Sequence, residues 1–120
     1  MNLKKYAQEA KRTNAKLPSK KMDNLHMVLG MVTEVAELAN IFKTNMAYGK
    51  KIDWINVQEE IGDAMFYLIN FCNINNFDLE NILQNNIDKL KSRYPDKFTE
   101  QHALNRDLKK ERKILEELGY

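Results

Sequence analysis

Apolar positions recur at helical spacing through most of the chain, and short polar or Gly- and Pro-containing stretches separate the runs. These runs and the residues that cap helix ends predict five helices. The first covers residues 2–14 and stops before Pro18, because the residue before a proline avoids the helical conformation. The other four are predicted to follow Asp, Asn or Thr caps: after Asp23 or Asn24 to Met46, after Asp53 to Ile74, after Asp78 to Arg93, and after Thr99 to Leu118, with Gly49 and Gly119 as stops.

Short connections between these helices favour antiparallel neighbours. We therefore expect an all-α fold, an antiparallel four-helix bundle with a C-terminal helical arm, formed as a single domain over residues 1–120. Four glycines and two prolines are too few for the many turns of an all-β sandwich, and one cysteine excludes an intrachain disulfide framework. No signal peptide and no membrane span are expected, which predicts a cytoplasmic protein that does not bind a membrane.

The second predicted helix is apolar around most of its circumference. At about 100° per residue, its polar arc holds Glu34 and Glu37 together with His26 and Gly30. A helix that is apolar nearly all round is usually buried, so these acids are expected to share a buried stripe. The chain offers little cover for such a helix, and we expect a homo-oligomer, a dimer or a tetramer.

The third predicted helix repeats this arrangement. Glu60 and Asp63 lie three residues apart beside its apolar arc, Tyr67 follows one turn later, and Glu59 lies near the edge of the same face. Two such helices packed antiparallel present four carboxylates to one another, and like charges in a buried site need a positive partner. An all-oxygen ligand set predicts Mg²⁺, with Mn²⁺ as the alternative, while stripes of acids paired with Lys and Arg remain a second interpretation.

Charge is distributed unevenly along the chain. Residues 1–21 hold seven Lys or Arg and one acid, whereas residues 22–87 hold three Lys and nine acids. An acidic centre with basic flanks suits a bound cation surrounded by an anion, although solvated helix faces vary in charge as well.

Two acidic segments in this order carry a family resemblance. Residues 30–37, Gly-Met-Val-Thr-Glu-Val-Ala-Glu, followed by residues 59–63, Glu-Glu-Ile-Gly-Asp, resemble the ExxE…ExxD signature of MazG-like nucleoside triphosphate pyrophosphohydrolases. Residues 48–51, 86–90 and 93–95 resemble later motifs of that all-α superfamily, and both ends of the chain resemble its compact phage-type members. The resemblance implies metal-dependent cleavage of a nucleoside triphosphate between the α and β phosphates, which yields a monophosphate and pyrophosphate.

The resemblance also implies roles for single residues. Glu34, Glu37, Glu60 and Asp63 match the family's metal-binding and catalytic acids one by one. Many members have a further Glu directly before the first motif acid, where this chain has Thr33. That departure leaves the general base and the number of metal ions open, with Glu59 as the residue that could compensate.

Five further side chains are candidates for substrate contacts. Tyr67 matches an aromatic position that contacts the base in the family, and His26 lies on the same arc as Glu34, where hydrogen bonding to a base and a core contact are equal alternatives. Asn86, Lys89 and Arg93 match the family's phosphate side, with a solvated helix face as the alternative. Lys50 and Lys51 are interpreted as mobile loop charges.

Three other functions compete with this interpretation. A dimeric dUTPase-like enzyme uses similar acidic motifs. A small helical nucleic-acid-binding protein would use the basic N-terminal segment, but the chain has no helix-turn-helix signature and no basic stripe interleaved with aromatics, so we expect no nucleic-acid partner. A helical interaction module would use the acids only for salt bridges.

Overall fold

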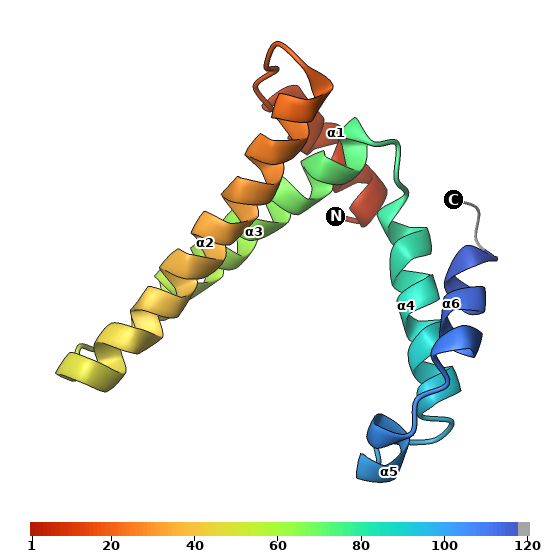
Figure 1. The fold of residues 1–120 in the computed structure, drawn as a ribbon. Helices are drawn as coiled ribbons and strands as arrows, with labels where there is room; N and C mark the ends of the chain where they lie inside the picture. The colour runs from red at the N-terminus through yellow and green to blue at the C-terminus, as the bar shows by residue number, and fades with distance from the viewer. Residues whose placement is uncertain (118–120) are drawn as a thin grey trace. The chain divides into compact units, whose positions relative to one another are not determined.

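Helices are the only regular secondary structure among residues 1–117, the part of the chain that the computed structural model describes (Figure 1). The all-α prediction is therefore confirmed. The chain divides into two compact units, one over Met1–Phe77 and one that begins at Asp78. The predicted four-helix bundle within one chain is not confirmed, and the single-domain assignment stays a prediction.

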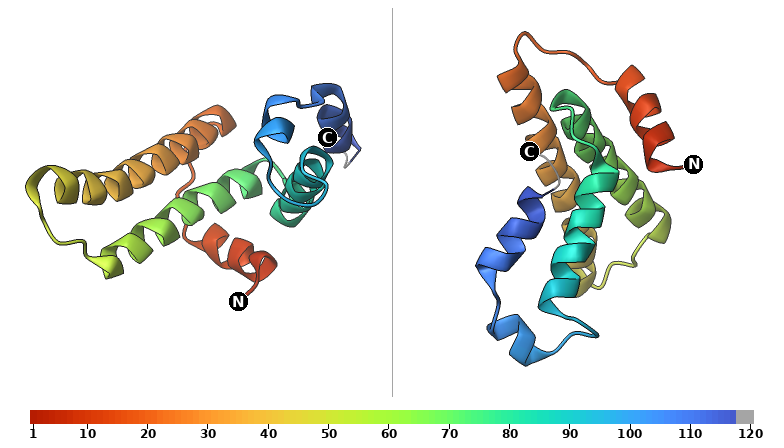
Figure 2. Two further views of the ribbon diagram at one scale, coloured as in Figure 1. Left: turned by 90° about the horizontal axis from the view of Figure 1, so that it is seen from below. Right: turned by 90° about the vertical axis from the view of Figure 1, so that its right-hand side faces the viewer.

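The first unit is a long helical hairpin with one short helix against it. Helix α2 (Lys20–Tyr48) and helix α3 (Trp54–Ile74) run antiparallel and lie side by side along most of their length (Figures 1 and 2). Helix α1 (Leu3–Arg12) packs against α3. The hairpin is thus the element that places residues of α2 opposite residues of α3.

The start of α2 differs from the predicted cap. Ser19 begins the helix by accepting a hydrogen bond from the Met22 amide, so α2 starts before Asp23. Asp23 lies buried inside the first turn, where its carboxylate accepts a hydrogen bond from the Leu17 amide at 2.8 Å. At the other end, Gly49 stops the helix as predicted, in a left-handed conformation with φ of 66° that glycine adopts without steric cost.

Asparagine side chains fasten the end of the hairpin that lies away from the turn. The Asn75 amide nitrogen donates to the Asn24 side-chain oxygen at 2.7 Å, and the Asn24 amide donates back at 3.3 Å. The fully buried Asn70 donates to the Ala10 carbonyl at 3.3 Å, which joins α3 to α1. These bonds fix the register of α2 against α3, and with it the level at which their acids meet.

The second unit consists of α4 (Leu79–Arg93), the short α5 (Glu100–Leu104) and α6 (Leu108–Glu116), with α6 packed against α4. The predicted caps Asp78 and Thr99 are confirmed. The prediction of one continuous last helix is wrong, because Asp107 caps a new helix by accepting from the Lys110 amide at 3.0 Å. The predicted end at Leu118 and stop at Gly119 lie outside the described residues.

One face of α2 is apolar and exposed to solvent, so the prediction that this helix is buried is wrong for a single chain. The residues of this face, which we call the α2 apolar face, are between 40% and 82% exposed: Leu25, Val28, Leu29, Val32, Val35, Phe42 and Met46. The opposite side of the helix holds Met27, which is fully buried. Apolar side chains gathered on one exposed face are characteristic of interaction surfaces.

Helix α2 is also long and apolar enough to cross a membrane, with a mean hydropathy of 1.3 over its best 18-residue window. This departs from the expectation that no apolar stretch approaches a membrane span. Length and composition alone are weak evidence, because core helices of other proteins meet the same criterion. Glu34 and Glu37 lie near the middle of α2, and ionised carboxylates are costly inside a bilayer.

Gly30 allows a close approach between the two long helices. A Cβ atom at Gly30 would lie 2.3 Å from the ring of Tyr67 on α3, far inside van der Waals contact. Gly62, the other glycine within the hairpin helices, has nothing within 4 Å of the corresponding position. Packing therefore requires glycine at position 30 but not at position 62.

This contrast predicts opposite effects of two matched substitutions. Gly30→Ala should lower the free energy of unfolding, because overpacking against a rigid ring costs roughly 1–3 kcal/mol and outweighs the better helix propensity of alanine. Gly62→Ala should raise it by up to about 1 kcal/mol, since only the propensity changes. Urea denaturation in EDTA measures both, and equal stabilisation by the two variants would contradict this account of the helix contact.

Candidate metal centre

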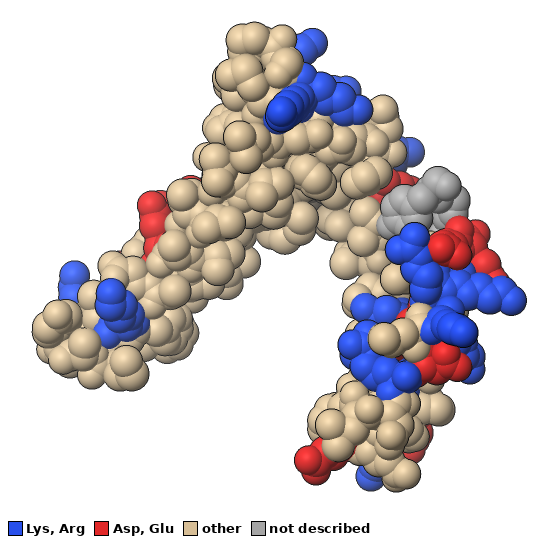
Figure 3. All heavy atoms as spheres, in the orientation of Figure 1, with Lys and Arg blue, Asp and Glu red and all other residues tan. Residues whose placement is uncertain are grey.

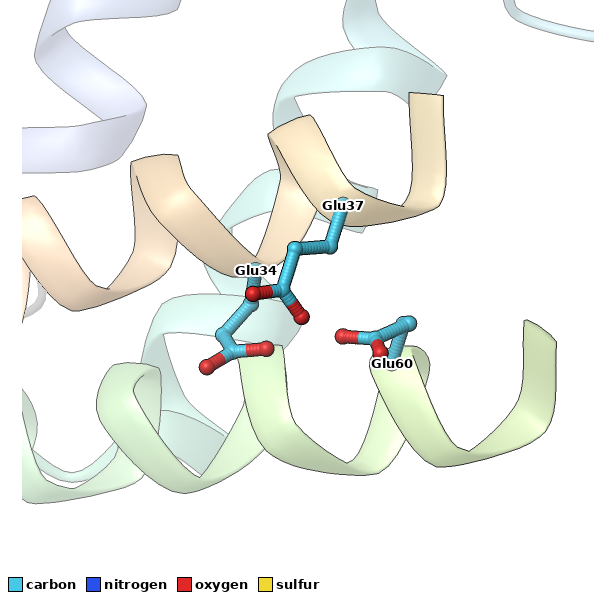
Figure 4. A group of neighbouring side chains, drawn as sticks. All are labelled: Glu34, Glu37 and Glu60. Atoms are coloured by element: carbon cyan, nitrogen blue, oxygen red, sulfur yellow. The ribbon is translucent and has the colours of Figure 1, made fainter. Parts of the chain in front are cut away.

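Three carboxylates meet where α2 and α3 face each other. Glu34 and Glu37 point from α2 toward Glu60 on α3 (Figure 4). One oxygen from each of the three lies within 4.8 Å of the other two. Their convergence follows from sequence spacing, since residues three apart on a helix share a face.

Within the described part of the chain, these acids form no ion pair with Lys or Arg. Glu60 is only 6% exposed, and one oxygen each of Glu60 and Glu34 is buried without a hydrogen-bond partner among the described residues. No Lys or Arg within residues 1–117 forms an ion pair with Glu34, Glu37, Glu60 or Asp63. The interpretation of the acids as a salt-bridge network therefore has no support in this part of the chain.

The pKa of the Glu60 carboxyl reflects the same crowding of negative charge. The pKa of its carboxyl is raised to about 7, first because its protonated form can donate a hydrogen bond to Glu34, and then because burial disfavours the charged form. A hydrogen bond to Glu37 and the negative charges of Glu37 and Glu34 raise this pKa further. Without a cation, the site lowers its charge by keeping a proton.

Asp63 lies in a second acidic group that shares Glu60. Oxygens of Glu59, Glu60 and Asp63 lie within 4.8 Å of one another, so the four predicted acids and Glu59 form two overlapping groups rather than one cage. Glu59, expected at the edge of the site, belongs to the second group. Asp63 also lies close enough to Tyr6 on α1 that its charge, after burial of the phenol, raises the pKa of Tyr6.

The candidate metal ligands suit a hard divalent cation. Every candidate ligand is a carboxylate oxygen, and two of the buried oxygens have no other partner among the residues described. Oxygen-only sites favour Mg²⁺, Mn²⁺ or Ca²⁺ over zinc, which prefers nitrogen and sulfur. Glu34, Glu37 and Glu60 could hold one such ion, and Asp63 and Glu59 extend the site beyond Glu60.

The predicted base-contacting residues adjoin the acids on one side. The ring of Tyr67 packs over Gly30 and meets the ring of His26 edge to face, with centroids 6.0 Å apart. The Nδ1 atom of His26 is buried with no hydrogen-bond partner in the described chain. The structure thus brings Tyr67 and His26 together one to two helical turns from the carboxylates.

The predicted phosphate-contacting residues all lie on α4, in the second unit. Asn86 is exposed and Lys89 is half-buried. Arg93 donates from Nε to Glu111 at 2.6 Å, and Arg106 binds the other oxygen of Glu111 at 2.8 Å. Arg93 therefore has a structural role that sequence reasoning missed, while its contact with substrate stays a prediction.

A pocket of about 580 Å³ opens beside the first acidic group, toward the turn of the hairpin. Glu37 and Glu60 line one part of it, and Lys50 and Lys51 of the α2–α3 turn line another. The volume lies within the range of ordinary small-ligand sites. Sequence reasoning treated the two lysines as loop charges, and only the conformation of the turn shows that they face the pocket.

The comparison with known families agrees with this geometry. The model of the MazG nucleotide pyrophosphohydrolase domain matches residues 22–98, a stretch that spans both acidic segments. The chain belongs to the MazG family. None of the curated proteins and none of the solved structures matches it.

Membership in the MazG family places the chain among nucleotide pyrophosphohydrolases, which are hydrolases that depend on a divalent metal. The acidic groups of α2 and α3 are the part of the described chain suited to such a metal. The predicted family resemblance is thereby confirmed.

The raised pKa of Glu60 predicts a pH dependence for the metal-free protein. A carboxyl whose pKa is about 7 in the folded state and about 4.3 in the unfolded state contributes stability that is lost as pH rises through this interval. In EDTA, Glu60→Gln should remove this decline, and it should be more stable than wild type above pH 7. Thermal melts from pH 4.5 to 8 test this, with Glu80→Gln on α4 as the control that keeps the wild-type profile. A steeper loss of stability in Glu60→Gln would contradict the assignment.

Proposed function

We propose that this MazG-family protein hydrolyses nucleoside triphosphates, ribo or deoxy, to the monophosphate and pyrophosphate in a Mg²⁺-dependent reaction. The observation that carries the proposal is the convergence of Glu34, Glu37 and Glu60, with no ion pair to a cationic side chain among residues 1–117. Mn²⁺ is the alternative ion. The free, buried thiol of Cys72 suits a reducing setting, and we propose a cytoplasmic location.

In this proposal the four motif acids, Glu34, Glu37, Glu60 and Asp63, hold the cation between α2 and α3. When bound, the cation supplies charge neutralisation for phosphate oxygens and a lowered pKa for the attacking water. Thr33 is an unsuitable base because a neutral hydroxyl is too weakly basic to take a proton from water, and here it donates to the Gly30 carbonyl at 2.9 Å. We assign the general base to Glu59, an exposed carboxylate next to Glu60 and Asp63.

The nucleoside is proposed to lie on the side of Tyr67 and His26. The Tyr67 ring offers an aromatic face, and the unpartnered Nδ1 of His26 can bond a polar edge of the base. Asn86 and Lys89 of α4 are proposed to contact the phosphates. Arg93 would contact them only while its guanidinium also binds Glu111.

The products of the reaction test this function. With Mg²⁺, the wild-type protein should convert one or more of the common dNTPs and NTPs into the monophosphate and pyrophosphate, and EDTA should abolish turnover because the acids supply no positive charge. Product analysis by ion-exchange chromatography distinguishes pyrophosphate from orthophosphate. Release of orthophosphate with a nucleoside diphosphate would contradict the proposal.

We also propose that the protein is a homo-oligomer in which the α2 apolar face of one copy packs against that of another. Two α2–α3 hairpins joined in this way would complete a four-helix bundle, which a single chain does not show. The support is the exposure of seven large apolar side chains on one helix face.

Sedimentation at micromolar concentration tests the oligomer. Wild type should sediment as a dimer or tetramer, and the double variant Leu29→Glu with Val32→Glu should sediment as a monomer, because two buried carboxylates would be unpaired at the interface. A wild-type monomer would contradict the proposal. A monomer that binds lipid vesicles through α2 would instead favour the membrane interpretation of this helix.

A further inference from the structure

Between Asp23 and Ile74, the Lys side chains of the hairpin lie toward its turn end. The Lys and Arg residues of this stretch are Lys43, Lys50 and Lys51, and α3 contains none. Figure 3 shows Lys and Arg side chains gathered at the turn, at the lower left, with acidic side chains farther along the hairpin. Of the three lysines, Lys50 and Lys51 line the 580 Å³ pocket that also contains Glu37 and Glu60, and Lys43 does not.

The backbone that carries the two lysines is held in place. Gly49 closes α2 in the left-handed conformation, with its amide donating to the Asn45 carbonyl at 2.9 Å. The Asn45 side-chain amide then donates to the Lys50 carbonyl at 2.8 Å. These two bonds hold the backbone of the turn at Gly49 and Lys50, and the turn places both lysines along the pocket.

Neither lysine is neutralised by a neighbouring acid. No ion pair involves Lys50 or Lys51 in residues 1–117. Asp53, the acid of the pocket wall closest to them in sequence, has an oxygen committed to the α3 N-cap, where it accepts from the Ile55 amide at 3.0 Å and the Asn56 amide at 3.3 Å. Two unpaired ammonium groups beside a polar pocket can bind an anion.

The groups along the hairpin occur in a linear order. From the turn they are the two lysines, then Glu37 with Glu60, then Glu34 with Asp63, then Tyr67 with Gly30, and last His26. Thr44, the α2 residue of the pocket nearest the turn, lies seven positions after Glu37, which is about 10 Å of helix. A molecule with a base at one end and phosphates at the other matches this order in one direction only.

We infer that Lys50 and Lys51 bind the terminal phosphates of the substrate, which leave as pyrophosphate, in the pocket between the acids and the hairpin turn. This inference rests on the proposed function, because it takes the nucleoside to lie on the Tyr67 side of the acids. Asn40, Thr44 and Asn56 line the same pocket and supply neutral hydrogen-bonding groups between the acids and the lysines. The lysines are binding residues, and no bond to them forms or breaks.

Equilibrium binding tests the inference without turnover. Inorganic pyrophosphate, a triphosphate with a non-hydrolysable α,β-imido bridge, and a nucleoside monophosphate are each titrated with Mg²⁺ into full-length wild type and the double variant Lys50→Gln with Lys51→Gln. The double variant should bind pyrophosphate and the triphosphate roughly tenfold or more weakly and the monophosphate equally well, as expected for lost charged hydrogen bonds. The double arginine variant should restore binding, and Lys43→Gln, the control at the same end of α2, should behave as wild type.

Three results with the variants would overturn the inference. These are wild-type affinity for pyrophosphate in the double glutamine variant, an equal loss in Lys43→Gln, which would indicate diffuse attraction, or an equal loss for the monophosphate. Absence of pyrophosphate binding by wild type would overturn it as well. Product analysis of wild type separates failure of this inference from failure of the proposed function. Release of orthophosphate contradicts the function. Release of pyrophosphate, with the same pyrophosphate affinity in wild type and in the double glutamine variant, contradicts only the assignment of the lysines.

Discussion

The hairpin is organised around a concentration of negative charge that its own side chains do not balance. Glu60 is buried against Glu34 and Glu37, and no cationic side chain within the described residues compensates them. Buried like charges of this kind raise the free energy of the fold unless a proton or a cation is bound. The raised pKa of Glu60 is the response of the metal-free protein, and a divalent cation is the response that its family membership favours.

The rest of the first unit holds the acids in this unfavourable arrangement. Reciprocal hydrogen bonds between the side-chain amides of Asn24 and Asn75 fix one end of the hairpin, and the caps at Gly49 and Asp53 fix the other. Gly30 lets Tyr67 pack directly on α2, so the two helices stay close at the level of the acids. A preorganised site of this kind binds a cation without first reorganising its ligands.

Sequence reasoning found the acids because their positions follow from helix geometry alone. Residues three apart share a face in any helix, so Glu34 with Glu37 and Glu60 with Asp63 could be paired before the fold was known. It missed the start of α2 because Ser19 and Asp23 are both good caps, and a hydrogen bond from the Leu17 amide draws Asp23 into a different role. It merged α5 and α6 because the cap at Asp107 interrupts an otherwise continuous polar helical pattern.

Other features depend on contacts that no local pattern encodes. The backbone position of Lys50 beside the pocket depends on the left-handed Gly49 and on a hydrogen bond from the Asn45 side chain, so the sequence alone indicates only a loop charge. The pattern of the α2 apolar face predicts a core helix, since hydrophobicity alone does not distinguish a buried face from an exposed one. The pairing of Arg93 with Glu111 joins α4 to a helix whose separate existence the sequence did not predict.

Direct binding of a divalent cation tests the central claim most directly. Metal-free wild type and Glu60→Gln are titrated with Mn²⁺ while electron paramagnetic resonance measures the free ion, and Mg²⁺ is then added as competitor. Glu60 is the informative position because it belongs to both acidic groups. The account predicts saturable Mn²⁺ binding by wild type that Mg²⁺ displaces, and binding at least roughly tenfold weaker in Glu60→Gln, since loss of even a supporting residue costs a metal site about that much. Absence of saturable binding in wild type, or equal affinity in the two proteins, would contradict it.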